Sequence, residues 1–438
     1  MGDVLRQLAV QERGGVGARG EHVGQRRVGA RAVMVQRHVV AVAREHERDF
    51  APQAARTAGD EDDAARAHSY NASMSVEPGA SVSTPLAQRI GRDIADAGGW
   101  IGFDRFMALA LYAPGLGYYE REPMPFGAMP SSGSDFVTAP EMSPWFGRAL
   151  ARQVAQWLAE SGTDTVYEFG AGSGALAEQL LGALGERVRR YAIVDVSGSL
   201  RARQRERLAR FGARVEWLTR LPARLRGVVV GNEVLDAMPV QLLHWDGAQW
   251  FERGVVAAGN AFAWADRPTT LHPPVDAPFV PGTVTEVHAQ AQGFVATVAE
   301  RLERGAALFV DYGFPAAEYY HPQRAGGTLM CHRAHRADTD PLADVGAKDI
   351  TAHLDFSAIA LAAQDAGADV LGYTSQGRFL LNCGLAELLA DADLRERALA
   401  HRLVAEHEMG ELFKVLAFGR GVGDDPLGFA PGDRTHTL

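Results

Sequence analysis

The segment from Glu168 to Gly174 has the residue types and the spacing of a ligand-binding turn. It reads Glu-Phe-Gly-Ala-Gly-Ser-Gly, and its alternating glycines allow a tight turn and a close approach between backbone and ligand. Asp195 follows about 20 residues later, the spacing at which dinucleotide-binding folds place a carboxylate that accepts hydrogen bonds from ribose hydroxyls. The two features together predict a site for a ligand that contains adenosine.

A second group of polar residues could orient a nucleophile and remove its proton. Asn232 and Glu233 directly follow an apolar run, and Asp236 lies three residues further on. Carboxylates placed at strand ends can act as general bases. Each residue also has an ordinary structural explanation: Asn232 and Glu233 could cap a helix, and Asp236 could stabilise a turn. We predict Glu233, Asn232, Asp236 and Glu141 as the catalytic residues, expect Asp311 to orient a loop, and predict no metal site.

The elements that position these residues alternate in type after Gly162. Short apolar segments of strand length are separated by segments with helical periodicity. This alternation predicts a largely parallel sheet covered by helices on both faces. Ligands bind such sheets outside the carboxyl ends of the strands, where Asp195 and Asn232 are expected. The predicted strands are 165–169, 191–196, 215–218, 227–230 and 306–311, and the predicted helices are 175–184 and 200–211.

Other segments depart from this alternation. Apolar residues at helical spacing predict two short helices between residues 86 and 111, interrupted at Gly98-Gly99. A longer helix is predicted to begin at Ser143-Pro144, because serine caps helices and proline is favoured in their first turn. Segment 241–265 predicts antiparallel hairpins. The polar segment 319–349 is predicted as a long loop.

The first 83 residues have a composition that does not favour folding. No leucine occurs between Gln11 and Pro85, and no isoleucine precedes Ile90. Such a segment cannot bury enough apolar surface to offset the backbone entropy lost on folding. Acidic residues scattered through it argue against a mitochondrial presequence. We expect a disordered or non-native extension, with Met74 as a better candidate start, and a folded domain over 84–438.

Charge and cysteine content limit the class of protein. The formal net charge is −10, which disfavours nucleic acid as a partner. The two cysteines, Cys331 and Cys383, fit a reducing compartment, and we predict a cytoplasmic location. No apolar run approaches the length that spans a bilayer, so no membrane insertion is expected. The oligomeric state stays open.

Five further motifs lie around these segments: Leu-Tyr-Ala-Pro-Gly-Leu-Gly-Tyr-Tyr at 111–119, Ser-Asp-Phe-Val-Thr-Ala-Pro-Glu at 134–141, Asn-Glu-Val-Leu-Asp-Ala-Met-Pro-Val at 232–240, Phe-Val-Asp-Tyr-Gly at 309–313, and Asp-Ile-Thr-Ala-His-Leu-Asp-Phe at 349–356. Together with the glycine turn, which has the E-x-G-x-G-x-G form of methyltransferase motif I, they closely resemble the MidA-like S-adenosylmethionine-dependent methyltransferases. That family includes mitochondrial complex I assembly-factor arginine methyltransferases and many bacterial members. The resemblance covers about Leu86 to the C-terminus. Ser134 stands where the family often has glycine, and Asp195 where glutamate is common.

The resemblance implies a fold, a cofactor and a reaction. The fold is a Rossmann-like class I methyltransferase core with a helical cap over 84–160, and with antiparallel and loop insertions at about 241–285 and 319–352 in the core 161–438. The donor is S-adenosyl-L-methionine. The reaction is symmetric ω-N-dimethylation of an arginine on a complex I subunit, in support of assembly. The implied cofactor-binding residues are Glu168, Gly170, Ala171, Gly172, Gly174, Asp195, Val196, Asn232, Asp135, Phe136 and Thr138.

Two other functions stay open at this point. The enzyme could methylate a small molecule, which would favour a closed acceptor pocket over a groove. The protein could instead be an assembly chaperone that keeps the cofactor site without catalysing a reaction. The chaperone hypothesis predicts that a Glu233→Ala variant still supports assembly.

Overall fold

The computed structural model describes residues 84–120, 137–195, 198–333 and 336–438. They belong to one compact unit, Val82–Leu438. The predictions made for residues 1–83 and for Asp135, Phe136 and Val196 fall outside the described ranges.

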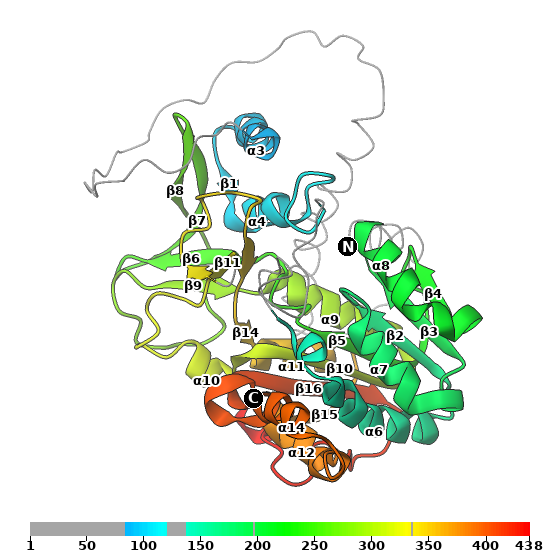
Figure 1. Cartoon of the computed structure of the whole chain (residues 1–438). Helices are drawn as coiled ribbons and strands as arrows, with labels where there is room; N and C mark the ends of the chain where they lie inside the picture. Colours follow the sequence, from blue (N-terminus) through cyan, green and yellow to red (C-terminus); the bar gives the residue numbers. More distant parts are fainter. Residues whose placement is uncertain (1–83, 121–136, 196–197, 334–335) are drawn as a thin grey trace, which may run out of the picture. The chain divides into compact units, whose positions relative to one another are not determined.

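A seven-stranded path forms the centre of the unit (Figure 1). β16 runs antiparallel to both of its neighbours, and the other pairings along the path are parallel. The chain leaves β2 toward β3 and β4 and then returns to β5 on the other side of β2. Such a reversal opens a crevice at the carboxyl ends of the strands, where ligands bind. The order is β15 (Asp369–Ser375), β16 (Phe413–Arg420), β10 (Leu302–Phe314), β5 (Leu225–Asn232), β2 (Thr165–Phe169), β3 (Arg190–Val194) and β4 (Val215–Leu218).

Helices cover both faces of this sheet, because successive side chains of each strand point to opposite faces. On one face, Val228 and Val230 of β5 pack in a core with α6 and α7. On the other face, Phe169 and Phe309 make ring contacts with Phe294 of α9. The fold is the predicted Rossmann-like class, with a mostly parallel sheet between helices. The first face carries α6 (Pro144–Ser161), α7 (Ala175–Leu184), α12 (Gln376–Asn382), α13 (Leu385–Leu388) and α14 (Leu394–Val404), and the second α9 (Ala289–Arg301) and α11 (Phe356–Asp365).

The long helix α6 begins and ends where the sequence predicts. The Ser143 hydroxyl accepts a hydrogen bond from the Trp145 amide at 3.3 Å, and Pro144 occupies the first helical position. Gly162 ends the helix with φ of 60°. The predicted grouping of α6 with the cap is wrong, because its apolar face packs in the core cluster under the central sheet. The predicted helix 200–211 is also corrected: α8 is Gly198–Leu208, followed by a 3-10 turn, Ala209–Arg214.

The cap and the two insertions together form one lobe with its own apolar core. Phe103, Phe106 and Leu111 of the cap share this core with Val255 and Ile350, which come from the two insertions. The cap supplies α3 (Pro85–Asp96), β1 (Ile101–Gly102) and α4 (Phe103–Tyr112); the first insertion supplies β6 (Gln241–Trp245), β7 (Trp250–Ala258), β8 (Ala261–Pro268) and β9 (Val284–Val287); the second supplies β11 (Met330–Arg333), β12 (Arg336–Asp338) and β13 (Asp349–Thr351). Segment 319–349 is therefore partly a sheet and not only a loop.

Gly305 is required where β10 passes β5. Its φ is +128°, and a Cβ atom at this position would collide with the carbonyl oxygen of Gly227. We expect Gly305→Ala to lower the free energy of unfolding by about 2–4 kcal/mol, because both strands are buried and cannot separate without losing ladder hydrogen bonds. Urea unfolding measures this change.

The matched control is Gly182→Ala on α7, where nothing lies within 4 Å of the added Cβ. Alanine there should raise the free energy of unfolding by about 0.5–1 kcal/mol, since glycine is unfavourable inside a helix. Equal stability of the two variants would contradict the packing described at Gly305.

In the part of the chain that the structure describes, no helix combines the length and apolarity needed to cross a membrane.

Candidate active site

The glycine turn lies at the carboxyl end of β2, at the point where the sheet order reverses. Gly170, Gly172 and Gly174 have φ of 61°, 53° and 84°, which favour glycine over residues with side chains. The Gly174 amide donates to the Ala171 carbonyl at 2.7 Å and closes the turn before α7. A Cβ atom on Gly172 would meet nothing within 4 Å. The turn therefore presents open backbone to a ligand.

Glu168 lies directly before this turn and is buried. Its Oε2 accepts a hydrogen bond from the Tyr191 hydroxyl at 2.6 Å. Burial raises the pKa of Glu168 to about 8, the Tyr191 hydrogen bond lowers it, and the charge of Asp195 raises it further. The carboxyl group is thus mostly protonated near neutral pH, and a nearby ligand cation would favour its ionised form.

This raised pKa predicts a pH-dependent stability difference for Glu168→Gln. The folded pKa of Glu168 lies above its ordinary value of 4.5. The contribution of Glu168 to the free energy of unfolding is therefore fully present below about pH 4.5, and it is lost as the pH rises through about 8. Glutamine does not titrate and can still accept from Tyr191. The melting temperature of the variant relative to wild type should rise by several degrees between about pH 5 and about pH 8.5. Parallel melting profiles across this range would contradict the shift.

Asp195 directly follows β3 and is buried. Gln204 of α8 donates from Nε2 to Asp195 Oδ2 at 2.8 Å and to the Gly172 carbonyl at 2.9 Å. The Trp217 indole in turn donates to Gln204 Oε1 at 2.9 Å. Gln204 therefore ties the acidic residue to the glycine turn. Sequence reasoning missed it, although it is the lone neutral amide in an arginine-rich helix.

Asn232 is the last residue of β5, and Glu233 and Asp236 lie in the turn that follows it. Asn232 Nδ2 donates to Glu233 Oε1 at 2.9 Å, and Glu233 has an unusual positive φ of 53°. Asp311, at the same end of β10, holds this turn, since its Oδ2 accepts from the amides of Leu235 at 2.9 Å and Asp236 at 3.3 Å. Asp311 thus orients the loop, as expected from the sequence. Asn232 Oδ1 is buried and has no hydrogen-bond partner among the described residues.

Tyrosines from the lobe and from β10 surround this turn. Tyr312 donates its hydroxyl to Asp236 Oδ2, and Tyr112 of α4 donates to the Ala237 carbonyl at 2.8 Å. Tyr119 donates to Asp349 Oδ1 at 2.9 Å. The rings of Tyr112 and Tyr119 stack with centroids 5.5 Å apart. The lobe therefore brings aromatic side chains to the carboxyl ends of β5 and β10.

The carboxyl groups in this cluster have raised pKa values. Burial raises the pKa of Glu233 to about 8, and Asp236 and Asp349 raise it further, while Asn232 and the Ala139 amide lower it. Burial also raises the pKa of Asp236 to about 6, against hydrogen bonds from Tyr312 and the Ala237 amide. A group with a pKa near neutral pH is well suited to accept a proton during catalysis.

His353 also lies beside this cluster. The sequence did not predict that position for it. Its ring contacts that of Tyr312, with centroids 5.0 Å apart. Burial lowers its pKa to about 4, and the charges of Arg324 and Lys414 lower it further. His353 is therefore neutral at physiological pH. Asp355 two residues later caps α11, accepting from the Ala358 amide at 3.2 Å, as expected for a helix start.

Glu141 lies elsewhere. It is on α5 (Ala139–Met142), which follows Thr138. Its Oε1 accepts from the Ser173 hydroxyl and lies 3.0 Å from Arg207 Nη1. These contacts join α5 to the glycine turn, and they direct Glu141 to Ser173 and Arg207 and not to Glu233 or Asp236.

The chemistry of these residues fits S-adenosylmethionine. The open backbone at Gly172 can accommodate the methionine part, and Asp195 can accept hydrogen bonds from a ribose. The buried, unpartnered Asn232 Oδ1 supplies a further acceptor beside them. Within the described ranges, no group of three or more histidine, cysteine or acidic side chains is arranged to hold a metal ion.

Comparisons with known proteins support the same assignment. Residues 149–374 match a family of S-adenosyl-L-methionine-dependent methyltransferases. A crystal structure of a COG1565 superfamily member from Burkholderia thailandensis, bound to S-adenosyl-homocysteine, is 53% identical, has a TM-score of 0.78, and covers 81% of this chain and 96% of its own. The zebrafish (Danio rerio) protein arginine methyltransferase NDUFAF7 is 30% identical over 73% of this chain and 84% of its own. The human protein of the same name is 26% identical over 78% and 85%.

These NDUFAF7 relatives are named as mitochondrial proteins, which contradicts the predicted cytoplasmic location. That prediction rested on the cysteine content, which reflects the redox state of a compartment and does not distinguish one reducing compartment from another. The cofactor prediction is confirmed by the family match and by the homologous complex with S-adenosyl-homocysteine. The chain belongs to the MidA-like family of S-adenosylmethionine-dependent methyltransferases.

Proposed function

We propose that this enzyme transfers methyl groups to an arginine side chain of a protein. The observation that carries the proposal is the pair of carboxyl groups at this turn, the half-buried Glu233 and the buried Asp236. Their pKa values are raised by burial, and the groups that lower them are neutral hydrogen-bond donors and not cations. A guanidinium group would supply the missing positive charge and several N–H donors in one plane. The names of the NDUFAF7 relatives, protein arginine methyltransferases, support the same acceptor.

The residues around the turn have complementary tasks in this reaction. S-adenosylmethionine supplies the activated methyl group. Glu233 holds the guanidinium and takes a proton as a nitrogen is alkylated, which the intrinsic guanidinium pKa of about 12.5–13.8 otherwise opposes. Asp236, fixed by Tyr312, holds a second nitrogen. The stacked pair Tyr112 and Tyr119 provides an aromatic wall that excludes water and can face a planar cation.

The finer proposal is that the product is symmetric dimethylarginine on a subunit of respiratory complex I, in support of complex I assembly. It is based on the resemblance of motifs 111–119, 134–141 and 232–240 to those of the assembly-factor methyltransferases. The acceptor of this chain is then another protein.

One experiment tests the proposal directly. The purified protein is incubated with methyl-labelled S-adenosylmethionine and a lysate from cells that lack it, and the labelled products are separated and hydrolysed. We expect label in one protein band and, after hydrolysis, in symmetric dimethylarginine. Label confined to small molecules would overturn the proposal in favour of a small-molecule methyltransferase. Normal complex I in cells that carry Glu233→Ala would favour a chaperone.

A further inference from the structure

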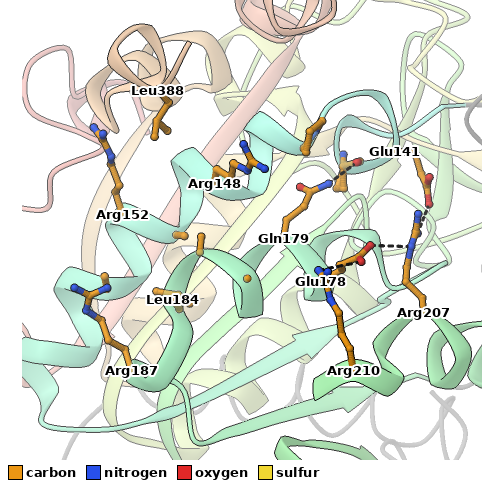
Figure 2. Close-up of a pocket in the computed structure, with 16 residues that line it drawn as sticks. Glu141, Arg148, Arg152, Glu178, Gln179, Leu184, Arg187, Arg207, Arg210 and Leu388 are labelled. Atoms are coloured by element: carbon orange, nitrogen blue, oxygen red, sulfur yellow. Dashed lines mark hydrogen bonds and ion pairs between the residues drawn. The ribbon is translucent and has the colours of Figure 1, made fainter. Parts of the chain in front are cut away.

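A groove of about 760 Å³ lies between α6 and α7, apart from the active-site cluster (Figure 2). Arg148, Ala151, Arg152 and Ala155 line it from α6 at helical spacing, and Gly182 is among its lining residues from α7. The opposite stripes of both helices pack in the core. We refer to this feature as the arginine groove; its lining includes neither Asp195 nor Glu233.

Arginines line both ends of the arginine groove, but only one end carries excess positive charge. Its lining contains five arginines and two glutamates, in a chain with a net charge of −10. At one end, Glu178 already pairs with Arg207 at 3.2 Å and Arg210 at 3.1 Å. The uncompensated charge is therefore concentrated at the other end, in Arg148, Arg152 and Arg187.

These three arginines are exposed, and their positive charges are hardly paired with carboxylates. Neither Arg148 nor Arg187 has a carboxylate partner among the described residues. Arg152 lies 3.8 Å from Glu387, whose side chain is 70% exposed, and such pairs contribute little. The Arg148 guanidinium is held over the Trp145 ring, 4.4 Å from its centroid, so its position is set before any partner arrives.

Small residues form the floor between the two helices. Ala151, Ala155, Gly182 and Ala183 line the groove, and a Cβ atom on Gly182 would meet nothing within 4 Å. A floor without long side chains allows another polypeptide backbone to approach closely. A single small anion would need the arginines but would leave this floor unfilled.

We propose that the arginine groove binds an acidic segment of a partner polypeptide. Guanidinium groups form bidentate hydrogen bonds with carboxylates, and several of them spaced along a groove match several acidic side chains spaced along a peptide. The partner's backbone lies on the floor at Gly182, and its carboxylates reach Arg148, Arg152 and Arg187. The uncompensated positive charge of the groove, in an otherwise acidic chain, is the complement of such a segment.

The experiment uses the full-length protein and a fluorescein-labelled dodecapeptide of glutamate and alanine, with binding followed by fluorescence anisotropy. We expect the triple variant Arg148→Gln, Arg152→Gln, Arg187→Gln to bind the peptide roughly tenfold or more weakly than wild type. The matched control is Arg92→Gln, Arg226→Gln, Arg395→Gln. It removes the same charge from exposed positions outside the groove and should bind as wild type.

A second variant, Gly182→Leu, fills the floor and leaves every charge in place. Leucine favours the helical conformation of α7 more than glycine does, so the fold is retained. We expect this variant also to lose peptide binding. Equal losses in both arginine variants would show only general charge attraction and would overturn the proposal. It would likewise be overturned if wild type failed to bind the peptide, or if inorganic phosphate displaced the peptide and bound equally well to Gly182→Leu.

Discussion

Replacing Glu233 with glutamine should lower kcat for methyl transfer by roughly 10²–10⁴-fold, while the affinity for S-adenosylhomocysteine stays within about twofold of wild type. Glutamine keeps the size of the side chain and the contact with Asn232 Nδ2 at 2.9 Å. It cannot take a proton from the acceptor nitrogen or balance its charge. Single-turnover methylation and calorimetric titration with S-adenosylhomocysteine measure the two quantities separately.

The pH dependence identifies Glu233 more specifically than the rate alone. Its pKa of about 8 applies to the unliganded enzyme, and the ionised form is the active base. The value of kcat/KM should therefore rise with pH up to about 8. With a guanidinium bound, the opposite charge lowers the pKa, so kcat should level off at a lower pH.

The exposed Glu303, whose carboxylate lies 3.0 Å from Arg224, provides the control. Glu303→Gln should leave both pH profiles unchanged. A Glu233→Gln enzyme that retained the wild-type rise in kcat/KM with pH would show that another group is the base.

Replacing Asp195 with alanine should weaken S-adenosylhomocysteine binding by roughly 10²–10³-fold. The carboxylate at this position can accept hydrogen bonds from both ribose hydroxyls, and each hydrogen bond to a charged group contributes about 1.5–3 kcal/mol. In addition, Gln204 loses its acceptor at 2.8 Å and can leave the Gly172 carbonyl. Isothermal titration calorimetry measures the loss.

Two further variants make this result interpretable. Asp164 precedes β2 at the opposite end of the strand, and its carboxylate lies 3.9 Å from Arg189. The Asp164→Ala variant should therefore bind S-adenosylhomocysteine as wild type does. Gln204→Ala removes the link between Asp195 and the glycine turn, and it should weaken binding by about tenfold, less than Asp195→Ala. Wild-type affinity in Asp195→Ala would mean that the ribose lies elsewhere.

Local sequence patterns were sufficient for β2, β3, β4, β5 and β10 of the central sheet, but they did not predict β15 and β16. The strands at 165–169 and 215–218 occur where short apolar runs predict them, and hairpins form in 241–265. Helix α6 was also predicted from a local signal, the Ser-Pro pair at its start. These patterns could not show which other part of the fold each helix or strand packs against. The apolar stripes of α4 and α6 look alike in sequence, yet one packs on the lobe and the other on the central sheet.

The same limit applies to the candidate site. The glycine turn and Asp195 are adjacent to predicted strands, so a one-dimensional pattern identifies them. Tyr112 and Asp349 come from elements far away in sequence and converge only after packing, and Gln204 of the next helix meets Asp195 only through the way α8 packs. A tyrosine in a cap helix carries no signal for its neighbour across more than a hundred residues. No sequence pattern around Glu141 indicated that Ser173 and Arg207 would engage its carboxylate.

The lobe formed by the cap and the two insertions cannot be completed until late in synthesis. Helices α3 and α4 are complete at residue 112, whereas the strands that cover their apolar faces begin at residue 241 and end at residue 351. At typical translation rates the ribosome needs on the order of 10 s to reach the first of these strands, and longer to reach β13. During that interval Phe103, Phe106 and Leu111 lack the partners that these strands supply. A chain that terminates before residue 351 therefore leaves its earliest helices exposed to chaperones and proteases.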